Sequence, residues 1–193
     1  RRRHGNVHDD RPACGSIEPL GGRRSEAVAQ SQQAKGPMTL LKIVQAARDS
    51  GDPSRLTEAM PYAKWLGLAP ENRTGELLTR LRFDPRNIGN PHLPAIHGGV
   101  IGATLETAAI FHMLWEGETL AVPKIVTITV DFLRSARPLD LLAKATLIKQ
   151  GRRIANVTVE AWQDDRSKPI AAARMHFLLP TRKAAKDASH DHA

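Results

Sequence analysis

The chain has 193 residues, a formal net charge of +8 and a single cysteine, Cys14. This length suits one domain with tails, and one cysteine excludes an intramolecular disulfide framework. No run of about 18 apolar residues is present, which excludes an ordinary membrane-spanning helix. Aromatic residues make up only 4% of the chain, so few side chains could stack on bases and nucleic-acid binding is not favoured. These features are typical of a cytoplasmic protein.

The two ends of the chain differ from its middle. Residues 1–37 are polar, rich in Gly and Arg and without apolar periodicity, which predicts a disordered arm. Met38 is the first methionine, so translation starting there would leave this arm out of the native protein. Residues 181–193 are also polar and predict a frayed tail. One folded domain is therefore expected over residues 38–180.

Apolar periodicity predicts two helices and a strand in the first half of that domain. A short amphipathic helix is expected at Thr39–Ala47, and a second over roughly Arg55–Leu66, with an interruption at Pro61. The alternation in Gly75–Phe83 predicts a strand. A loop rich in Pro, Asn and Gly then runs from Asp84 to Ile96.

The next stretch, about Gly98–Glu116, is apolar nearly all round and predicts a helix buried on most faces. One carboxylate, Glu106, lies in its middle, and the neighbours three and four residues away are uncharged. Burying a lone carboxylate is costly unless something offsets it. Glu106 is either a catalytic carboxylate or an ordinary residue on an exposed stripe, and its uncharged neighbours favour catalysis.

Directly before this helix stands His97-Gly98-Gly99. The glycines let the backbone approach a ligand closely, and the first N–H groups of a helix attract negative charge. Such donors predict an acyl-transfer site. His97 could act as a base, ligate a metal or brace the loop, and bracing is favoured. No Cys or acidic residue stands at ligand spacing from His92 and His97, so no metal site is expected.

After Pro123 the apolar period changes from helical to two. Four segments each place their apolar residues on one face, and turn signals separate the segments. Four consecutive strands with short connections predict an antiparallel meander whose apolar face wraps the long helix, an α+β fold. The expected strands are Ile125–Leu133, Leu139–Lys149, Arg153–Trp162 and Ile170–Leu179.

A long apolar helix followed by a wrapping antiparallel sheet resembles the hot-dog fold. The residues H-G-G-V-I-G-A-T-L-E-T-A at 97–108 resemble the helix-start motif of the phenylacetate-pathway branch of the hot-dog acyl-CoA thioesterases. In that branch an Asp or Glu lies nine residues after the motif histidine, which is the position of Glu106 here. The segments V-D-F-L-R at 130–134 and Q-G-R-R-I-A-N-V at 150–157 also resemble the family.

The resemblance implies hydrolysis of acyl-CoA thioesters to free acid and coenzyme A, with no metal or redox cofactor. It gives the amide of Gly98 or Gly99 the task of polarising the thioester carbonyl, and makes Glu106 the general base or nucleophile. An upstream Asn orients water in the family; Asn90, seven residues before His97, is the nearest match. A homodimer or dimer of dimers with shared sites is implied. The alternative is a non-catalytic acyl-CoA-binding or regulatory protein of the same fold.

Three arginines, Arg134, Arg152 and Arg153, fall at predicted strand ends or turns. They are candidates for binding the phosphates of coenzyme A, because guanidinium groups match phosphate geometry. They could equally belong to a solvated surface. Both interpretations stay open at the level of the sequence.

Overall fold

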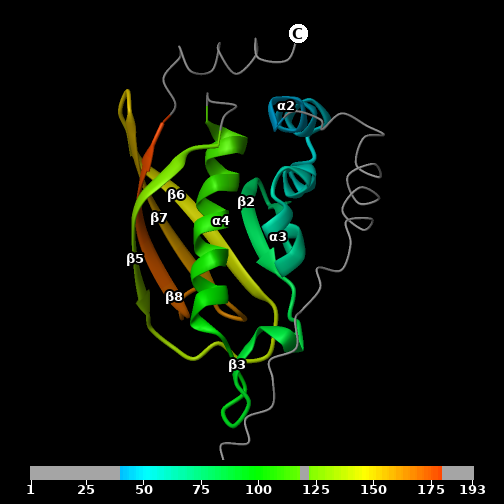
Figure 1. Cartoon of the computed structure of the whole chain (residues 1–193), viewed down its shortest axis with the longest axis vertical. Helices are drawn as coiled ribbons and strands as arrows, with labels where there is room; N and C mark the ends of the chain where they lie inside the picture. The colour runs from blue at the N-terminus through cyan, green and yellow to red at the C-terminus, as the bar shows by residue number, and fades with distance from the viewer. Residues whose placement is uncertain (1–39, 118–121, 180–193) are drawn as a thin grey trace, which may run out of the picture. The chain divides into compact units, whose positions relative to one another are not determined.

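The computed structural model describes residues 40–117 and 122–179. In these, one long helix, α4 (Gly98–Glu116), lies against a six-stranded antiparallel sheet (Figure 1). This is the α+β arrangement that the sequence predicts. The expected arm at 1–37 and tail at 181–193 lie outside the described residues, so the domain boundaries stay predictions. Within the described part of the chain, no helix is long and apolar enough to cross a membrane.

Three short helices precede the sheet: α2 (Leu40–Ser50), the 3₁₀ helix η1 (Pro53–Ala59) and α3 (Pro61–Leu66). The first confirms the predicted amphipathic helix. The second predicted helix is divided in two, because Pro61 lacks the N–H that would continue η1 and instead begins α3. Gly67 ends α3 in the left-handed conformation, with φ of 77°.

The strands of the large sheet follow the spatial order β1-β2-β6-β7-β8-β5. A short ribbon, β3 (Ile88–Asn90) with β4 (Ala95–Ile96), lies between β2 and α4 in the chain, after the 3₁₀ turn η2 (Pro85–Asn87). The large sheet contains β1 (Leu68–Arg73), β2 (Glu76–Leu81), β5 (Lys124–Phe132), β6 (Leu141–Gln150), β7 (Ile154–Trp162) and β8 (Ala171–Leu178).

The strand β1 is not predicted from the sequence. Its residues, L-A-P-E-N-R, include Pro70 and three polar side chains, which do not read as a strand. Only β2 pairs with it, so β1 lies at an edge of the sheet. A proline is tolerated there because one side of an edge strand needs no hydrogen-bond donors.

The predicted four-strand meander is wrong in one respect. The strands β6, β7 and β8 do form a meander, but β5 pairs with β8 at the far edge of the sheet and not with β6. Alternation of apolar residues specifies which face of a strand is buried, whereas it does not specify which strand lies alongside. The error therefore concerns the order of strands and not their existence.

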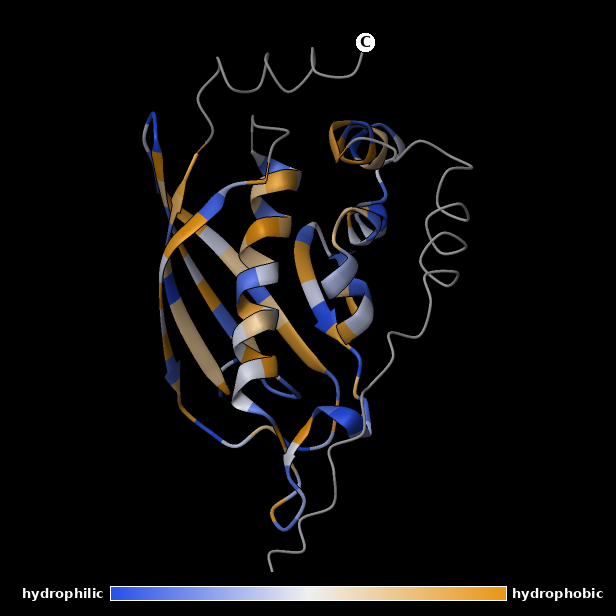
Figure 2. Ribbon diagram, viewed as in Figure 1, coloured by the Kyte–Doolittle hydropathy of each residue, from blue (hydrophilic) through white to orange (hydrophobic). Residues whose placement is uncertain are grey.

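The core lies between α4 and the inner face of β6, β7 and β8, and most of α4 is hydrophobic or neutral (Figure 2). Most inner-face residues expected on these strands are buried, except that Leu139 precedes β6 and is exposed and Leu147 is only partly buried. The strand β5, in contrast, extends beyond the cover of α4. Its apolar residues Ile128 and Phe132, which pair with β8, are 39% and 57% exposed, and Val126, at a register shift between the two strands, is 64% exposed. The sheet therefore ends in an edge strand with an open apolar side. The buried inner-face residues are Leu141, Ala143, Ala145, Ala155, Val157, Val159, Ala161, Ala171, Ala173, Met175 and Phe177.

Candidate active site

His97 is the residue that caps the start of α4. Its Nδ1 accepts a hydrogen bond from the N–H of Gly99 at 2.9 Å, and its own N–H donates to the carbonyl of Asn87 at 2.8 Å. Its carbonyl accepts from the N–H groups of Val100 and Ile101. Because Nδ1 is the acceptor, the neutral ring carries its proton on Nε2. The structure thus gives His97 the bracing role that the sequence favours.

Gly89 on β3 holds His97 in this position. A Cβ built on Gly89 would lie 2.7 Å from Cδ2 of His97 and 2.9 Å from its Cα and Cβ. No larger residue fits at that distance without moving the backbone of the helix start. Gly89 therefore allows the ribbon to approach the turn that begins α4, a role not recognised from the sequence.

Only one of the two motif glycines keeps an open amide. The N–H of Gly99 is engaged by His97, whereas that of Gly98 has no partner among residues 40–117 and 122–179. A free N–H at a helix start lies at the positive end of the helix dipole and can bind a developing oxyanion. Of the two donors that the resemblance implies, the structure favours Gly98.

Glu106 is half-buried on an open face of α4, and no described side chain or backbone group bonds to its carboxylate. The space beside it is open, since a Cβ built on Gly102 would meet nothing within 4 Å. The carboxylate is therefore less buried than the sequence predicts. Glu106 follows Gly98 by eight positions, about 12 Å along a helix. Within one chain the two groups are too far apart to act on one carbonyl.

Asn90 closes the tip of the β3–β4 ribbon. Its Oδ1 accepts the N–H of His92 at 3.0 Å and that of Leu93 at 3.4 Å, as in an Asx turn. Among the described residues no hydrogen bond joins Asn90 to Glu106. The structure thus gives Asn90 a local structural role and does not bring it together with the carboxylate in one chain.

The three candidate arginines do not form one cluster. Arg134 follows β5 near the start of α4, where its Nη1 donates to the carbonyl of Pro169 at 2.6 Å. Arg152 and Arg153 lie in the exposed turn between β6 and β7, and neither side chain has a hydrogen-bond or ion-pair partner in the described part of the chain. The strand register places that turn at the opposite end of the sheet, and a strand of this length spans about 26 Å.

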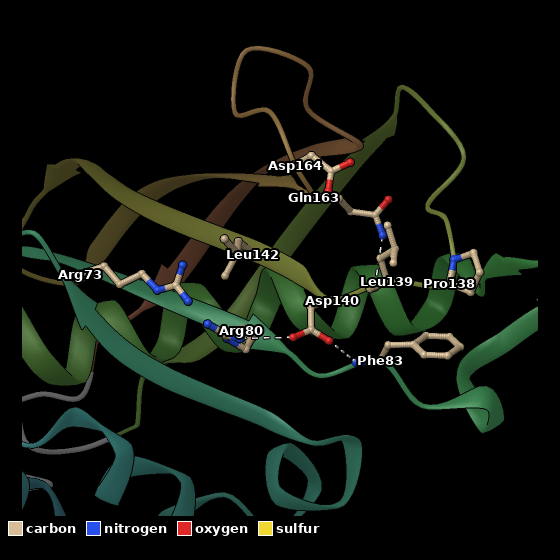
Figure 3. Close-up of a pocket in the computed structure, with 9 residues that line it drawn as sticks. All are labelled: Arg73, Arg80, Phe83, Pro138, Leu139, Asp140, Leu142, Gln163 and Asp164. Carbon is tan, nitrogen blue, oxygen red and sulfur yellow. Dashed lines mark hydrogen bonds and ion pairs between the residues drawn. The ribbon is translucent and has the colours of Figure 1, made fainter.

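Two hollows open at the end of the sheet near the start of α4, and neither includes Gly98 or Glu106. In the larger one, about 470 Å³ in volume (Figure 3), Asp140 accepts from the N–H of Phe83 at 2.8 Å and from Arg80 at 3.3 Å. These bonds join the end of β2 to the start of β6. The smaller hollow, about 330 Å³, is lined by Arg134, Ser135, Arg137, Gln163, Asp164, Asp165, Lys168 and Ile170.

The cations near both hollows are largely paired. Arg80 binds Glu71, Arg137 binds Asp164, and Lys168 lies 3.4 Å from Asp165. Such pairing leaves little free positive charge for an anionic ligand. Among the described residues, no group of three or more His, Cys, Asp or Glu side chains could hold a metal ion.

Comparison with known proteins agrees with this architecture. The model of the Thioesterase superfamily matches residues 93–170, which include the start of α4 and the strands β5 to β7. A protein of Chromobacterium violaceum with a crystal structure is 44% identical, aligned over 72% of this chain and 97% of its own, with a TM-score of 0.58. The chain belongs to the thioesterase superfamily.

Two further relatives carry more specific names. The medium/long-chain acyl-CoA thioesterase YigI of Salmonella typhimurium is 29% identical over 135 residues, which cover 62% of this chain and 86% of the relative. A phenylacetic acid degradation-related protein of Ralstonia eutropha is 25% identical, covering 62% of this chain and 90% of its own, with a TM-score of 0.54. The long helix wrapped by an antiparallel sheet is the hot-dog fold of this superfamily.

Proposed function

We propose that this protein hydrolyses acyl-CoA thioesters to a free acid and coenzyme A. The observation that carries the proposal is that α4 presents both an open amide, at Gly98, and a carboxylate without a partner among the described residues, at Glu106. The first can bind a carbonyl oxygen and the second can activate water or attack directly. Membership of the thioesterase superfamily and the name of the Salmonella relative support acyl-CoA as the substrate class.

The reaction needs few groups, because a thiolate is a good leaving group. The N–H of Gly98 donates to the thioester oxygen, which gains negative charge as the carbonyl carbon is attacked. Glu106 either removes a proton from the attacking water or adds to the carbonyl itself, forming an anhydride that water then cleaves. The C–S bond breaks and coenzyme A leaves as its thiolate. No metal or redox cofactor is required by these steps.

The distance between the two groups argues for a site shared by two protomers. Gly98 and Glu106 of one chain lie about 12 Å apart along α4, so one carbonyl cannot reach both. The edge strand β5 has an unpaired side and exposed apolar residues, including Val126 and Ile128, which proteins ordinarily cover. A two-fold homodimer that pairs β5 with its copy would cover this side and bring Glu106 of the partner chain toward Gly98. Two such dimers could associate further.

The same two-fold symmetry would give the β6–β7 turn a function. If β5 pairs antiparallel with its copy, the partner's sheet runs in the opposite direction. The partner's β6–β7 turn then lies at the same end as the start of α4 in the first chain. Arg152 and Arg153 would then bind coenzyme A phosphates at a site built on the other chain, and Arg134 of that chain lies at the same end. The proposed location is the cytoplasm, because a chain with a single cysteine forms no intramolecular disulfide and so suits a reducing compartment.

A thiol-release assay with acyl-CoAs of increasing chain length tests this function. Wild-type protein should release coenzyme A, and Glu106→Gln should not, while both bind acyl-CoA in calorimetry. Binding without thiol release by the wild-type protein at every chain length would instead support the non-catalytic acyl-CoA-binding alternative. Absence of both binding and release would overturn the proposal.

A further inference from the structure

Phe132, the last residue of β5, is a large apolar side chain that the fold leaves 57% exposed. Its ring nevertheless has a defined neighbour. A Cβ built on Gly98 would meet two ring carbons of Phe132 at 3.4 Å. The ring therefore stands about one methyl group away from the backbone that carries the open amide.

Backbone hydrogen bonds hold this end of β5 against the start of α4. The N–H of Ile96, just before the helix, donates to the carbonyl of Ala136 at 3.0 Å. The N–H of Leu133 donates to the carbonyl of Ile170 at 2.8 Å. The segment that follows Phe132 is thus tied on one side to the chain entering α4 and on the other to β8 (Figure 1). The backbone that carries Phe132 cannot shift far from the start of α4 without breaking these bonds.

The position of the ring has a consequence for any thioester bound there. An oxygen that accepts from the N–H of Gly98 lies about 3 Å from that nitrogen, so the carbonyl carbon and the next acyl carbon lie within a few ångströms of the helix start. The Phe132 ring lies against this helix start and keeps much of its surface exposed. An apolar ring at that distance contacts the acyl group where it joins the carbonyl.

We infer that Phe132 is the wall of the thioester site and determines the shape of the acyl group that can react. Straight acyl chains pass the ring, whereas a branch at the carbon beside the carbonyl meets it. This inference rests on the proposed function and adds the residue that discriminates between substrates. Phe132 acts by contact with substrate and takes no part in proton transfer.

A second residue of β5 distinguishes contact with substrate from general loosening of the strand. Thr129 is exposed and pairs with Arg174 of β8, whereas Phe132 pairs with Ala171, so the two side chains lie on opposite faces of the sheet. Thr129→Ala therefore tests for loosening of β5 without altering the face that carries Phe132.

The experiment compares two isomeric eight-carbon substrates, octanoyl-CoA and 2-propylpentanoyl-CoA, which differ in branching and not in carbon number. The quantity measured is the ratio of kcat/KM for the branched over the straight thioester. Phe132→Ala should raise this ratio about tenfold, the discrimination expected from one apolar contact. Phe132→Leu should raise it less, and Thr129→Ala should leave it unchanged. Sedimentation of each variant checks that the oligomeric state matches the wild type.

An unchanged ratio in Phe132→Leu and Phe132→Ala overturns the inference, as does an equal rise in Thr129→Ala. If Phe132→Ala does not fold or assemble, the ratio in Phe132→Leu decides. If wild-type protein cleaves neither substrate, the proposed function fails separately. The dissociation constants of the straight and the branched thioester, measured by calorimetry on the same variants, then test Phe132 independently of catalysis. Relative affinity for the branched thioester should rise most in Phe132→Ala and less in Phe132→Leu.

Discussion

His97 accepts, through Nδ1, the hydrogen bond that the N–H of Gly99 donates at 2.9 Å. This one contact separates the roles of three adjacent residues. The His97 imidazole caps the helix, and the Gly99 N–H donates to it. The Gly98 N–H remains able to donate to a substrate oxygen. A histidine that serves as a cap through its lone pair is not free to serve as a base through the same nitrogen.

The capping role predicts a stability change on substitution of His97. His97→Ala removes the acceptor for the Gly99 N–H and should lower the free energy of unfolding by about 1 kcal/mol, as for other helix N-caps. His97→Asn supplies another acceptor and should retain most of that stability. Urea unfolding followed by circular dichroism measures both. His92→Ala, an exposed residue of the same ribbon, is the control, and an equal loss there would contradict the assignment.

The role of Glu106 predicts a change in catalysis with little change in stability. Glu106→Gln keeps the size of the side chain but neither removes a proton nor attacks, so thiol release should fall by about 10²-fold or more. The melting temperature should stay near the wild-type value, because the carboxylate has no partner among the described residues. Glu116→Gln at the exposed end of the same helix serves as the control. Near-wild-type turnover in Glu106→Gln would remove Glu106 from the mechanism.

The fold was predictable to the extent that local pattern determines it. The period-two segments predict β6, β7 and β8 with the correct buried faces, and the apolar stretch after His97 predicts α4. The place of β5 beside β8 was not predictable, because strand order depends on contacts between distant segments. For the same reason the exposure of Ile128, on a strand with clear alternation, could not be foreseen.

The candidate site was predictable in its residue types and less so in its geometry. The His-Gly-Gly motif and Glu106 are visible in the sequence, but the choice of Gly98 over Gly99 depends on where the His97 ring points. Asn90 was selected by its distance along the chain, whereas its side chain turns back onto its own ribbon. Phe132 lies in the V-D-F-L-R segment that resembles the family, but the sequence does not assign it to the site, since only the folded chain places it beside Gly98.

The basic turn between β6 and β7 predicts an effect on binding without an effect on chemistry. Changing Arg152 and Arg153 together to Ala should raise KM for acyl-CoA several-fold and leave kcat nearly unchanged, because the nucleotide end does not react. The effect should shrink at high salt, where exposed charges are screened. A thioester without the nucleotide should not respond. Arg174→Ala on the outer face of β8 is the control, and a wild-type KM in the double variant at low salt would leave the turn without this role.

Burial of His112 on α4 predicts a pH dependence of stability. Burial lowers the pKa of His112 below its usual value of 6.5; nearby Glu116 opposes this shift, and Lys144 adds to it more weakly than burial. Because the pKa of His112 is lower in the folded chain, the unfolded chain binds the proton more tightly. Neutral His112 therefore contributes stability above about pH 6.5, and this contribution is lost as the pH falls through the lower folded-state pKa. Between pH 8 and pH 5, His112→Gln should lose less stability than the wild type. Urea midpoints at both pH values measure the difference, with exposed His176→Gln as control; equal losses in His112→Gln and wild type would contradict it.

A shared site predicts that two inactive variants restore activity when their subunits are mixed. Gly98→Pro removes the open N–H and adds ring carbons near Phe132. The helix start should be kept, because proline suits the first position of a helix and His97, at φ −60° and ψ 134°, already has a conformation allowed before proline. Gly98→Ala places a similar carbon near Phe132 but keeps the N–H, and so controls for bulk. Gly98→Pro and Glu106→Gln should each be nearly inactive alone.

In a mixed dimer, an intact Gly98 from one chain meets an intact Glu106 from the other at one of the two sites. Random exchange makes about half of the dimers mixed, so the mixture should recover about one quarter of wild-type thiol release per dimer, as two-fold symmetry requires. If the amide and the carboxylate acted within one chain, every site in the mixed dimer would lack one group, and no activity would return. Subunits are exchanged by dilution and reconcentration, and mass spectrometry confirms that the mixed dimer has formed. If the mixed dimer is present and no activity returns, the shared site is refuted.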